Sequence, residues 1–246
     1  MHQFSQWPLR RGDTRIAVLA HRGRGTDSPD NTLEAFSAAL AAGADGVELD
    51  VRRSADGRAV VHHDAEVPGL GPLYLLRHAD LPPHVATLEE ALERCRGAVV
   101  DVEVKAAPME AGFDPAQQLA GEVAAIVTAA LAGAAGPSAA FVTSFWPATV
   151  EAVRHARPEL EAGLLVVPGL DMFSGLEEAV AVGASVVLPI AAQCGAELVE
   201  AAHRRRVAVI PWAVDTDVEI ASARDAGVDA VITDRPARAL ALLESG

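Results

Sequence analysis

Two acidic residues lie two positions apart within a short apolar segment, residues 46–51. They are Glu48 and Asp50, and valine or leucine occupies the positions between and beside them. Successive side chains of a β-strand point to opposite faces, so a strand here places both carboxylates on one face and the apolar side chains on the other. Carboxylate oxygens on a shared face are the ligands that hard divalent cations prefer.

A second acidic segment repeats this pattern. Asp101, Glu103 and Lys105 alternate with the valines of residues 100–104. Burying several like charges without a cation costs several kcal/mol, so the acids of the two segments predict a bound cation on the face that they share. Charges from both strands are therefore expected to point into the interior of one fold.

The predicted metal ligands are Glu48, Asp50 and Glu103. Ligation by oxygen alone, with no cysteine nearby in the sequence, favours Mg²⁺ or Ca²⁺ over Zn²⁺, without choosing between the first two. The alternative is an ion network in which the acids pair with basic side chains instead, namely Lys105, Arg22 or Arg52.

Two histidines follow predicted strands directly. His21 comes after the apolar residues 16–20, and His63 is followed by Asp64, whose carboxylate can fix the tautomer of the imidazole. Two imidazoles beside a phosphodiester supply general acid-base catalysis, because one accepts a proton from the nucleophile while the other protonates the leaving alkoxide. The other histidines, including His62, are interpreted as structural residues.

Basic and amphipathic side chains complete the candidate site. Arg22 and Lys105 are predicted to contact phosphate oxygens, the arginine as a bidentate fork and the lysine as a point charge. Gly23 could let the backbone approach a ligand closely. Trp212 ends a predicted strand and forms either an apolar wall for the substrate or simple core packing. Asn31 is a helix-cap candidate that is also counted among the phosphate-binding residues.

Short β-branched or apolar runs alternate with Ala-rich helical stretches along the whole chain of 246 residues. An additional short strand is predicted at residues 58–62. The eight principal strands are predicted at residues 16–20, 46–51, 98–104, 139–143, 161–166, 184–188, 207–211 and 230–233.

Parallel strands joined by helices are buried on both faces, and eight such units close a barrel more readily than they extend an open sheet. The predicted fold is α/β, a (β/α)8 TIM barrel in a single domain over residues 1–246, with a core of about residues 15–244. A doubly wound sheet is the alternative. Reactive groups of such barrels lie at the carboxyl ends of the strands, where the candidate residues are predicted to be.

Capping chemistry predicts where several helices begin and end. Asp234 precedes Arg235-Pro236 at the end of the last predicted strand and is interpreted as a helix cap rather than a catalyst. Capping boxes are predicted at Asn31 with Glu34 and at Thr87 with Glu90, and helix ends at Gly43 and Gly97.

The formal charge of −14 and the isoelectric point of about 4.9 disfavour nucleic acids and anionic membrane surfaces as partners. Cys95 and Cys194 lie in unrelated segments, which is typical of free thiols in a reducing compartment. Residues 1–15 lack the apolar stretch of a signal peptide, and no later segment predicts a membrane span. A cytoplasmic protein acting on a small-molecule substrate is expected; the oligomeric state is not predicted.

The ordered motifs of the chain resemble the glycerophosphodiester phosphodiesterase family over nearly its whole length. Because these motifs are ordered and spaced, their combination is far more specific than any single one. They are His21-Arg22-Gly23, Pro29-Asp30-Asn31-Thr32, Gly46-Val47-Glu48-Leu49-Asp50-Val51, His63-Asp64, Ala86-Thr87-Leu88-Glu89-Glu90, Glu103-Val104-Lys105, Ser144-Phe145, Trp212-Ala213-Val214 and Thr233-Asp234-Arg235-Pro236.

This resemblance implies a triosephosphate-isomerase-type barrel that binds a divalent ion and hydrolyses glycerophosphodiesters to sn-glycerol 3-phosphate and an alcohol such as choline or ethanolamine. It implies acid-base roles for His21 and His63, and phosphate contacts from Arg22 and Lys105. The positions matching the metal ligands of the family are Glu48, Asp50 and Glu103.

The chain departs from the family at Asp30, where glutamate is usual, and at Ala213, where threonine is frequent. The segment of residues 65–86 is short, which leaves little room for the inserted cap of some relatives and suggests an open site. Two alternatives are therefore kept, a lysophospholipid-cleaving enzyme of the phospholipase D type and a barrel that binds phosphoesters without cleaving them.

Overall fold

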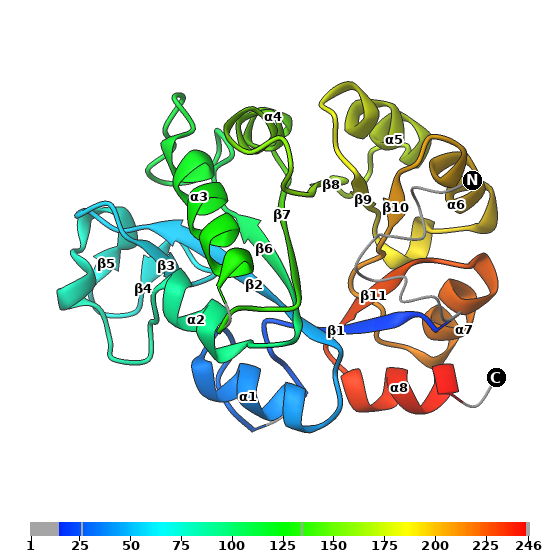
Figure 1. The fold of residues 1–246 in the computed structure, drawn as a ribbon, viewed down its shortest axis with the longest axis horizontal. Helices are drawn as coiled ribbons and strands as arrows, with labels where there is room; N and C mark the ends of the chain where they lie inside the picture. Colours follow the sequence, from blue (N-terminus) through cyan, green and yellow to red (C-terminus); the bar gives the residue numbers. More distant parts are fainter. Residues whose placement is uncertain (1–14, 26, 134, 245–246) are drawn as a thin grey trace.

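The computed structural model describes residues 15–25, 27–133 and 135–244 of the chain. Within them, eight parallel strands form the wall of a barrel, and helices surround it (Figure 1). The wall strands are β1 (Ala17–His21), β2 (Gly46–Arg53), β6 (Val99–Val104), β7 (Ala139–Ser144), β8 (Ala162–Leu165), β9 (Val186–Leu188), β10 (Ala208–Val209) and β11 (Ala230–Thr233). The helices are α1 (Leu33–Ala41), α2 (Leu88–Arg94), α3 (Gln118–Ala132), α4 (Pro147–Ala156), α5 (Met172–Ala181), α6 (Ala196–Arg204), α7 (Asp217–Ala226) and α8 (Pro236–Glu244).

The sheet curls until its first and last members meet. Its spatial order is β10-β9-β8-β7-β6-β2-β1-β11. Three backbone hydrogen bonds then join β11 and the residue before it to β10 and the residues after it. They run from Asp229 N to Val209 O at 3.0 Å, from Ile232 N to Pro211 O at 3.1 Å and from Val214 N to Ile232 O at 2.9 Å. The predicted (β/α)8 barrel is confirmed, and the alternative of an open doubly wound sheet is wrong.

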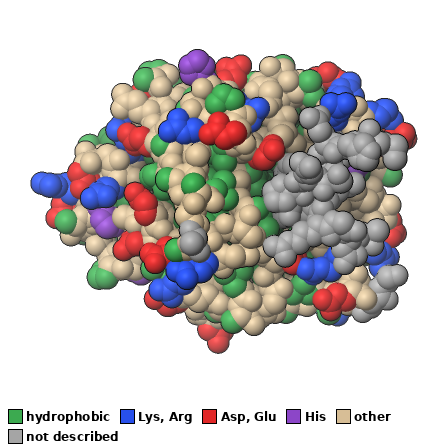
Figure 2. Space-filling view, in the orientation of Figure 1, with side chains coloured by type: hydrophobic (Ala, Val, Ile, Leu, Met, Phe, Trp, Pro, Cys, Tyr) green, Lys and Arg blue, Asp and Glu red, His purple; other side chains and the backbone are tan. Residues whose placement is uncertain are grey.

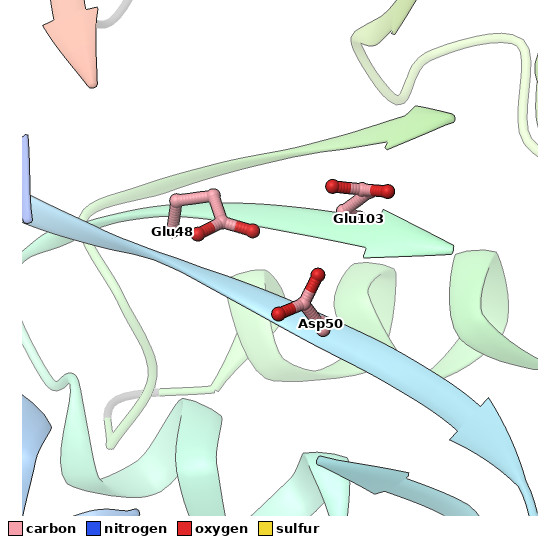
Figure 3. Close-up of side chains that lie close together, drawn as sticks. All are labelled: Glu48, Asp50 and Glu103. Carbon is pink, nitrogen blue, oxygen red and sulfur yellow. The ribbon is translucent and has the colours of Figure 1, made fainter. Parts of the chain in front are cut away.

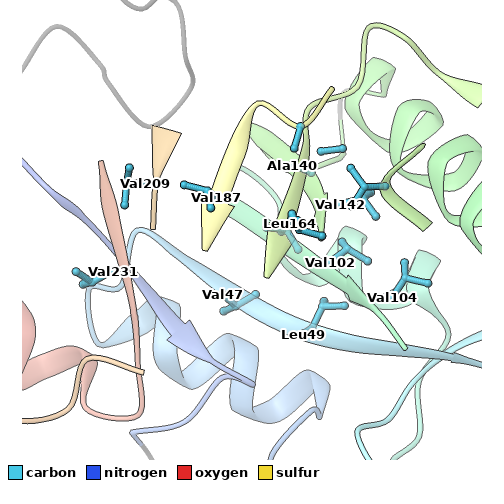
Figure 4. Packing of buried hydrophobic residues seen from close by; sticks show 14 of the residues in the cluster. Val47, Leu49, Val102, Val104, Ala140, Val142, Leu164, Val187, Val209 and Val231 are labelled. Carbon is cyan, nitrogen blue, oxygen red and sulfur yellow. The ribbon is translucent and has the colours of Figure 1, made fainter. Parts of the chain in front are cut away.

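Each wall strand is buried on both faces, as parallel strands require. One face packs against the helices and includes Val47, Leu49 and Val102 (Figure 4). The other faces the barrel interior, where a smaller cluster contains Leu19 and Phe141. Full burial of such a side chain stabilises the fold by roughly 1.5–3 kcal/mol. The valines and leucines that alternate with the acids face the helices, as predicted.

One of the two predicted capping boxes is present in the structure, and the other is not. The capping box of Thr87 and Glu90 is present at α2. The predicted box at Asn31 is wrong, because Thr32 caps α1 and accepts a hydrogen bond from Ala35 N. Two helix ends are confirmed by left-handed glycines, at Gly43 with φ 98° and at Gly97 with φ 75°.

The connection from β2 to α2 forms a small lobe at one end of the barrel, at the left of Figure 1. It contains β3 (Ala59–Val61), which confirms the additional strand predicted at residues 58–62 and runs antiparallel to β2. The hairpin of β4 (Glu66–Val67) and β5 (Gly71–Pro72) follows. Two 3₁₀ turns follow, η2 (Leu73–Leu75) and η3 (His78–Asp80), and the lobe has its own apolar cluster. A further 3₁₀ turn, η4 (Ala191–Gln193), precedes α6.

The surface and the thiols are consistent with the composition. Lys and Arg side chains on the face shown in Figure 2 lie in separate small groups beside acidic ones. Cys95 and Cys194 are free and buried. No helix among the described residues is long and apolar enough to cross a bilayer. Residues 1–14, on which the expectation of a missing signal peptide rests, lie outside the described residues.

Candidate active site

The strand register sets the candidate residues in two layers near the carboxyl ends of β1, β2 and β6, which we call the barrel mouth. In the lower layer, His21 is the register partner of Glu48, and Glu48 is the partner of Asp101. In the upper layer Asp50 is the partner of Glu103. Neighbouring parallel strands thus bring together residues that are far apart in the sequence.

Three carboxylates converge between β2 and β6 (Figure 3). One oxygen atom from each of Glu48, Asp50 and Glu103 lies within 4.8 Å of the others. The exposed fractions of these residues are 3%, 0% and 7%, so water screens their charges little. Their convergence, expected from the strand pattern, is present in the structure.

Basic side chains neutralise only part of this cluster. The Lys105 Nζ atom lies 2.9 Å from Asp50 Oδ1 and also pairs with Glu103, while Arg22 Nε lies 3.2 Å from Asp50 Oδ2. Arg52, the third basic residue of the ion-network alternative, pairs with Glu110 instead. Three carboxylates therefore face two cations, and the network alone does not account for them.

The unpartnered oxygen of Glu48 shows where a cation fits. Glu48 Oε1 is buried and has no hydrogen-bond partner among the described residues. A buried carboxylate oxygen without a partner is unfavourable, and a hard divalent ion ligated by oxygens satisfies it. Glu48, Asp50 and Glu103 thus form a donor set that suits a divalent metal.

The surroundings shift the pKa values of the three clustered acids in different directions. Burial, and then the charge of Asp50, raise the pKa of Glu48 well above its usual range. Burial also raises the pKa of Glu103, although Lys105 opposes this. Burial would raise the pKa of Asp50 too, but Lys105 and Arg22 together lower it. The environment thus favours the neutral form of Glu48 and Glu103 and the charged form of Asp50.

The turn after β1 contacts the carboxylate cluster and is closely packed. Arg22 adopts a left-handed backbone with φ 54°, an uncommon conformation for a residue other than glycine, and its amide donates to Glu48 Oε2 at 2.9 Å. Gly23, with φ 72°, has no space for a Cβ atom, which would lie 2.8 Å from Phe36 Cδ1. This glycine serves the packing of α1, and the expectation that it admits a ligand finds no support in these contacts.

Asn31 holds Asp50 rather than capping α1. Its Nδ2 donates to Asp50 Oδ2 at 2.8 Å, and the Asp50 amide donates to Asn31 Oδ1 at 3.1 Å. The Asn31 backbone is left-handed, with φ 56°, a conformation that asparagine adopts more readily than most residues. The amide therefore orients one member of the carboxylate cluster.

The His21 imidazole is held by Asp234, which follows the last strand of the wall. Its Nδ1 lies 2.6 Å from Asp234 Oδ1, and its Nε2 lies 3.9 Å from Glu48 Oε2. Asp234 also accepts from Arg24 Nη1 at 2.6 Å, and Arg24 Nε donates to Asp30 at 2.6 Å. Asp234 was interpreted as a helix cap rather than a catalyst, but its carboxylate binds His21 and Arg24. Asp234 follows β11, which is the neighbour of β1, and this adjacency emerges only in the closed barrel.

His63 follows β3, which pairs with the end of β2. Its Nδ1 lies 2.7 Å from Asp64 Oδ1, as the adjacent sequence positions suggested. Burial lowers the pKa of His63 below its usual 6.5, outweighing the opposite effects of Asp50 and Asp64. His63 lines a cavity of about 170 Å³ together with Arg22 and Asn31.

An aromatic pair forms the apolar side of the site. The rings of Phe145 and Trp212 meet edge to face with centroids 5.3 Å apart, and Trp212 Nε1 donates to Leu188 O at 2.9 Å. Lys105 Nζ lies 5.9 Å from the centre of the Phe145 ring. Phe145 was not among the predicted site residues, although its place directly after β7 is the same signal that identified His21.

Comparison with known proteins decides the family. Residues 21–73 and 71–238 match the glycerophosphoryl diester phosphodiesterase family. The chain belongs to this family. It is therefore, by family, a phosphoric diester hydrolase.

Individual relatives cover most of the chain. It is 33% identical to the probable glycerophosphodiester phosphodiesterase 1 of Mycobacterium tuberculosis, over 93% of each protein. It is 28% identical to a glycerophosphodiester phosphodiesterase of Caldanaerobacter subterraneus, over 94% of this chain and 99% of the relative. A phosphodiesterase of Oleispira antarctica, solved with the product sn-glycerol 3-phosphate, has a similar fold, with a TM-score of 0.78, 21% identity, and coverage of 94% and 97%.

The contact between His21 and Asp234 leads to a prediction for this member of the phosphodiesterase family. Asp234→Asn keeps the shape of the side chain but removes the charge that fixes the imidazole. We expect kcat to fall by about 10- to 100-fold, as when the partner of a functional histidine is removed. Steady-state kinetics test this, with Asp225→Asn on the exposed end of α7 as the control; equal activities of Asp234→Asn and wild type would contradict it.

Asp101 lies in the lower layer, beside Glu48 and one layer below Asp50 and Glu103. Thr143 donates to its Oδ1 at 2.8 Å, and its Oδ2 is buried without a hydrogen-bond partner among the described residues. Burial raises the pKa of Asp101 well above its usual 3.8, outweighing the Thr143 hydrogen bond. The folded chain therefore keeps a proton that the unfolded chain releases, and the contribution of this group to stability falls as pH rises.

Asp101→Asn replaces this acid with a neutral isostere and is expected to remove that pH dependence. At pH 8 we expect a stabilisation on the order of 1 kcal/mol relative to the ionisable acid, or a melting temperature about 2–4 °C higher. Thermal unfolding of the metal-free protein at pH 5 and pH 8 measures the effect. A variant that melts below the wild type at pH 8 would show that Asp101 is needed in its charged form.

Proposed function

We propose that this protein hydrolyses glycerophosphodiesters to sn-glycerol 3-phosphate and an alcohol, with a divalent ion, Mg²⁺ or Ca²⁺, held at the barrel mouth. The observation that carries the proposal is the cluster of Glu48, Asp50 and Glu103. His21 Nε2 lies 3.9 Å from Glu48 Oε2, and His63 is near enough to Asp50 to affect its pKa. Membership of the family supports it, as does the Oleispira phosphodiesterase solved with glycerol 3-phosphate.

The substrate phosphate would lie against the basic side chains of the mouth. Arg22 and Lys105 are both anchored to Asp50, which holds their charged groups in place before a substrate arrives. A divalent ion on the three acids would supply a Lewis acid that offsets charge developing on the phosphate oxygens. An acidic protein thereby presents a locally cationic pocket to an anionic substrate.

The two imidazoles divide the proton transfers. His63 has a lowered pKa, so its ring is neutral near pH 7, and Asp64 binds Nδ1, which leaves Nε2 to accept the proton of the nucleophile. His21, bound through Nδ1 to Asp234, would then donate a proton from Nε2 to the leaving alkoxide. Phe145 and Trp212 would offer an apolar wall to the carbon atoms of the substrate.

A coupled assay for released glycerol 3-phosphate tests the function. Glycerophosphocholine, glycerophosphoethanolamine and glycerophosphoglycerol are each incubated with metal-free protein, and then with Mg²⁺ or Ca²⁺. We expect turnover only with metal. Phosphodiesters recovered intact in every combination would instead favour a barrel that binds phosphoesters without cleaving them. A cytoplasmic location remains part of the proposal and is tested by fractionation of the source cells.

The distribution of exposed apolar side chains favours lysophospholipids as a second class of substrate. Of the ten large hydrophobic side chains exposed among the described residues, eight lie in connections that follow strands β3, β6, β8 and β10 or in the first turn of the next helix. The other two, Leu131 and Val180, lie near the opposite ends of their helices. The eight are Leu70, Tyr74, Leu75, Met109, Val167, Leu170, Phe173 and Val218.

Apolar side chains gathered around a site suit a substrate with an acyl chain or one presented in a micelle. The net charge of −14 favours zwitterionic over anionic lipid. Lysophosphatidylcholine and glycerophosphocholine are therefore compared at equal concentrations, above and below the critical micelle concentration, with mass spectrometry of the products. Mass spectrometry also distinguishes lysophosphatidic acid from a cyclic phosphate. Cleavage of the water-soluble diester alone would reject this second class.

A further inference from the structure

Arg52 lies in the site without taking part in the carboxylate cluster. It follows Asp50 by two residues on β2, and it is only 7% exposed. Its guanidinium pairs with neither Glu48, Asp50 nor Glu103. A buried arginine at the end of a strand that carries two predicted metal ligands requires another explanation.

The Arg52 guanidinium contacts residues from two different strand-to-helix connections at the barrel mouth. Arg52 Nε donates to the backbone carbonyl of His63 at 2.7 Å, and Arg52 Nη2 lies 2.9 Å from Glu110 Oε2. We propose that Arg52 is a positioning residue for His63 and that Glu110 holds Arg52 in the required orientation. The proposal rests on the proposed function, because it assigns His63 a task that depends on the position of its ring.

His63 needs such an anchor because no wall strand carries it. It follows the short strand β3, and the nearest backbone hydrogen bond to the wall is from His62 N to Asp50 O at 3.0 Å. The side-chain partner, Asp64, is 71% exposed, so water competes for that contact. The bond from Arg52 is shielded from water and is made to the His63 peptide itself, so it fixes the point from which the imidazole extends.

The geometry requires an arginine. A guanidinium presents several N–H donors in one rigid plane, so one donor can bind the His63 carbonyl while another binds a carboxylate. Glu110 lies in the connection between β6 and α3, which also begins with Lys105. The contact thus ties the segment that carries His63 to the segment that carries a predicted phosphate ligand.

The next residue along β2 offers a matched control. Arg53 is also paired with a glutamate, since its Nη2 donates to Glu122 Oε1 at 3.0 Å. Glu122 belongs to α3, on the outside of the barrel, and no hydrogen bond or ion pair among the described residues links Arg53 to His63. Substitution of Arg53 or Glu122 therefore removes an arginine–glutamate pair from the same strand end without releasing the His63 peptide.

The kinetic test compares the two pairs. Arg52→Ala is expected to lower kcat by about 10- to 100-fold, the range for partners that orient a functional group, with KM changed by less than about threefold. Glu110→Gln is expected to cause a smaller fall in kcat, while Arg53→Ala and Glu122→Gln stay near the wild type. Added guanidinium ion should restore part of the kcat of Arg52→Ala but none of that of His63→Ala.

Equal losses from Arg52→Ala and Arg53→Ala, or an effect on KM alone, would overturn the proposal. Circular dichroism confirms folding of each variant. If Arg52→Ala fails to fold, Arg52→Lys and Glu110→Gln replace it. Arg52→Lys is expected to lose more kcat than Glu110→Gln, because one ammonium group cannot make both contacts in the same geometry. Full activity in Arg52→Lys and in Glu110→Gln would reject the role.

A second readout does not depend on turnover. The imidazole proton resonances of His63 in metal-free protein are assigned by their loss in His63→Ala and then followed in the other variants. Arg52→Ala should shift or broaden them, whereas Arg53→Ala should leave them unchanged. An unchanged His63 signal in Arg52→Ala contradicts the positioning role. If the wild type cleaves no phosphodiester while Arg52→Ala still shifts the His63 resonances, the proposed function alone is contradicted.

Discussion

Glu48→Gln is expected to lower kcat/KM by about 10³-fold or more, because loss of a metal ligand removes several kcal/mol of transition-state stabilisation. This substitution is the most selective among the three acids. Glu48 makes no ion pair with Lys105 or Arg22, and its Oε1 has no partner among the described residues. A glutamine can still accept the hydrogen bond from the Arg22 amide, so the turn around the site should persist.

The measurement is turnover of glycerophosphocholine across a titration of Mg²⁺ and of Ca²⁺. The variant should need a much higher concentration of metal than the wild type or fail to respond at all. Glu151→Gln, an exposed position on α4, is the control and should behave as wild type. If Glu48→Gln responds to metal like the wild type, Glu48 is not a ligand of a catalytic ion.

Replacement of either histidine by alanine is expected to lower kcat by about 10²-fold or more, the usual scale of general acid-base catalysis. The dependence of kcat/KM on pH distinguishes the roles of the two histidines. Burial lowers the pKa of His63 below 6.5, so its neutral form persists to lower pH than that of an ordinary histidine. The acid limb of kcat/KM should therefore lie below pH 6.5 and should be absent in His63→Ala.

Kinetics at pH 5 to 9 for wild type, His21→Ala and His63→Ala provide this comparison. His155→Ala, on the exposed side of α4, is the control. Wild-type turnover in either variant would remove that histidine from the mechanism. An acid limb that persists in His63→Ala would assign the proton acceptor to another group.

The fold was predictable because its signals are local and repeated. Alternation of apolar runs with helical stretches located all eight wall strands, with boundaries shifted by a residue or two, as between the predicted residues 207–211 and the observed Ala208–Val209. The strand period of two was sufficient to place Glu48, Asp50 and Glu103 on one face. Closure required the last strand to meet both β1 and β10, which eight similar units favour.

The errors have a common physical cause, since each depended on contacts between distant segments. Asp234 has the local sequence of a cap, but β11 lies beside β1 and brings its carboxylate to His21. Asn31 also has a capping sequence, but Asp50 binds its amide from the neighbouring strand. Local propensity cannot reveal a partner that the barrel supplies from elsewhere in the chain.

Arg52 illustrates a further limit of the sequence. From the sequence, pairing of Arg52 with the acids of the cluster was kept as an alternative to a metal. The side chain instead extends to Glu110 and to the His63 carbonyl. The choice between these partners depends on where the connections after β3 and β6 lie, and neither connection has a regular pattern that predicts its path.

Anomalous diffraction from crystals grown with Mn²⁺, a scattering substitute for Mg²⁺, tests the central claim most directly. We expect one strong peak at the barrel mouth, within about 2.0–2.4 Å of oxygens from Glu48, Asp50 and Glu103, and its loss in crystals of Glu48→Gln. Crystals with active protein and full Mn²⁺ exposure, but with no peak among these three acids, would contradict it.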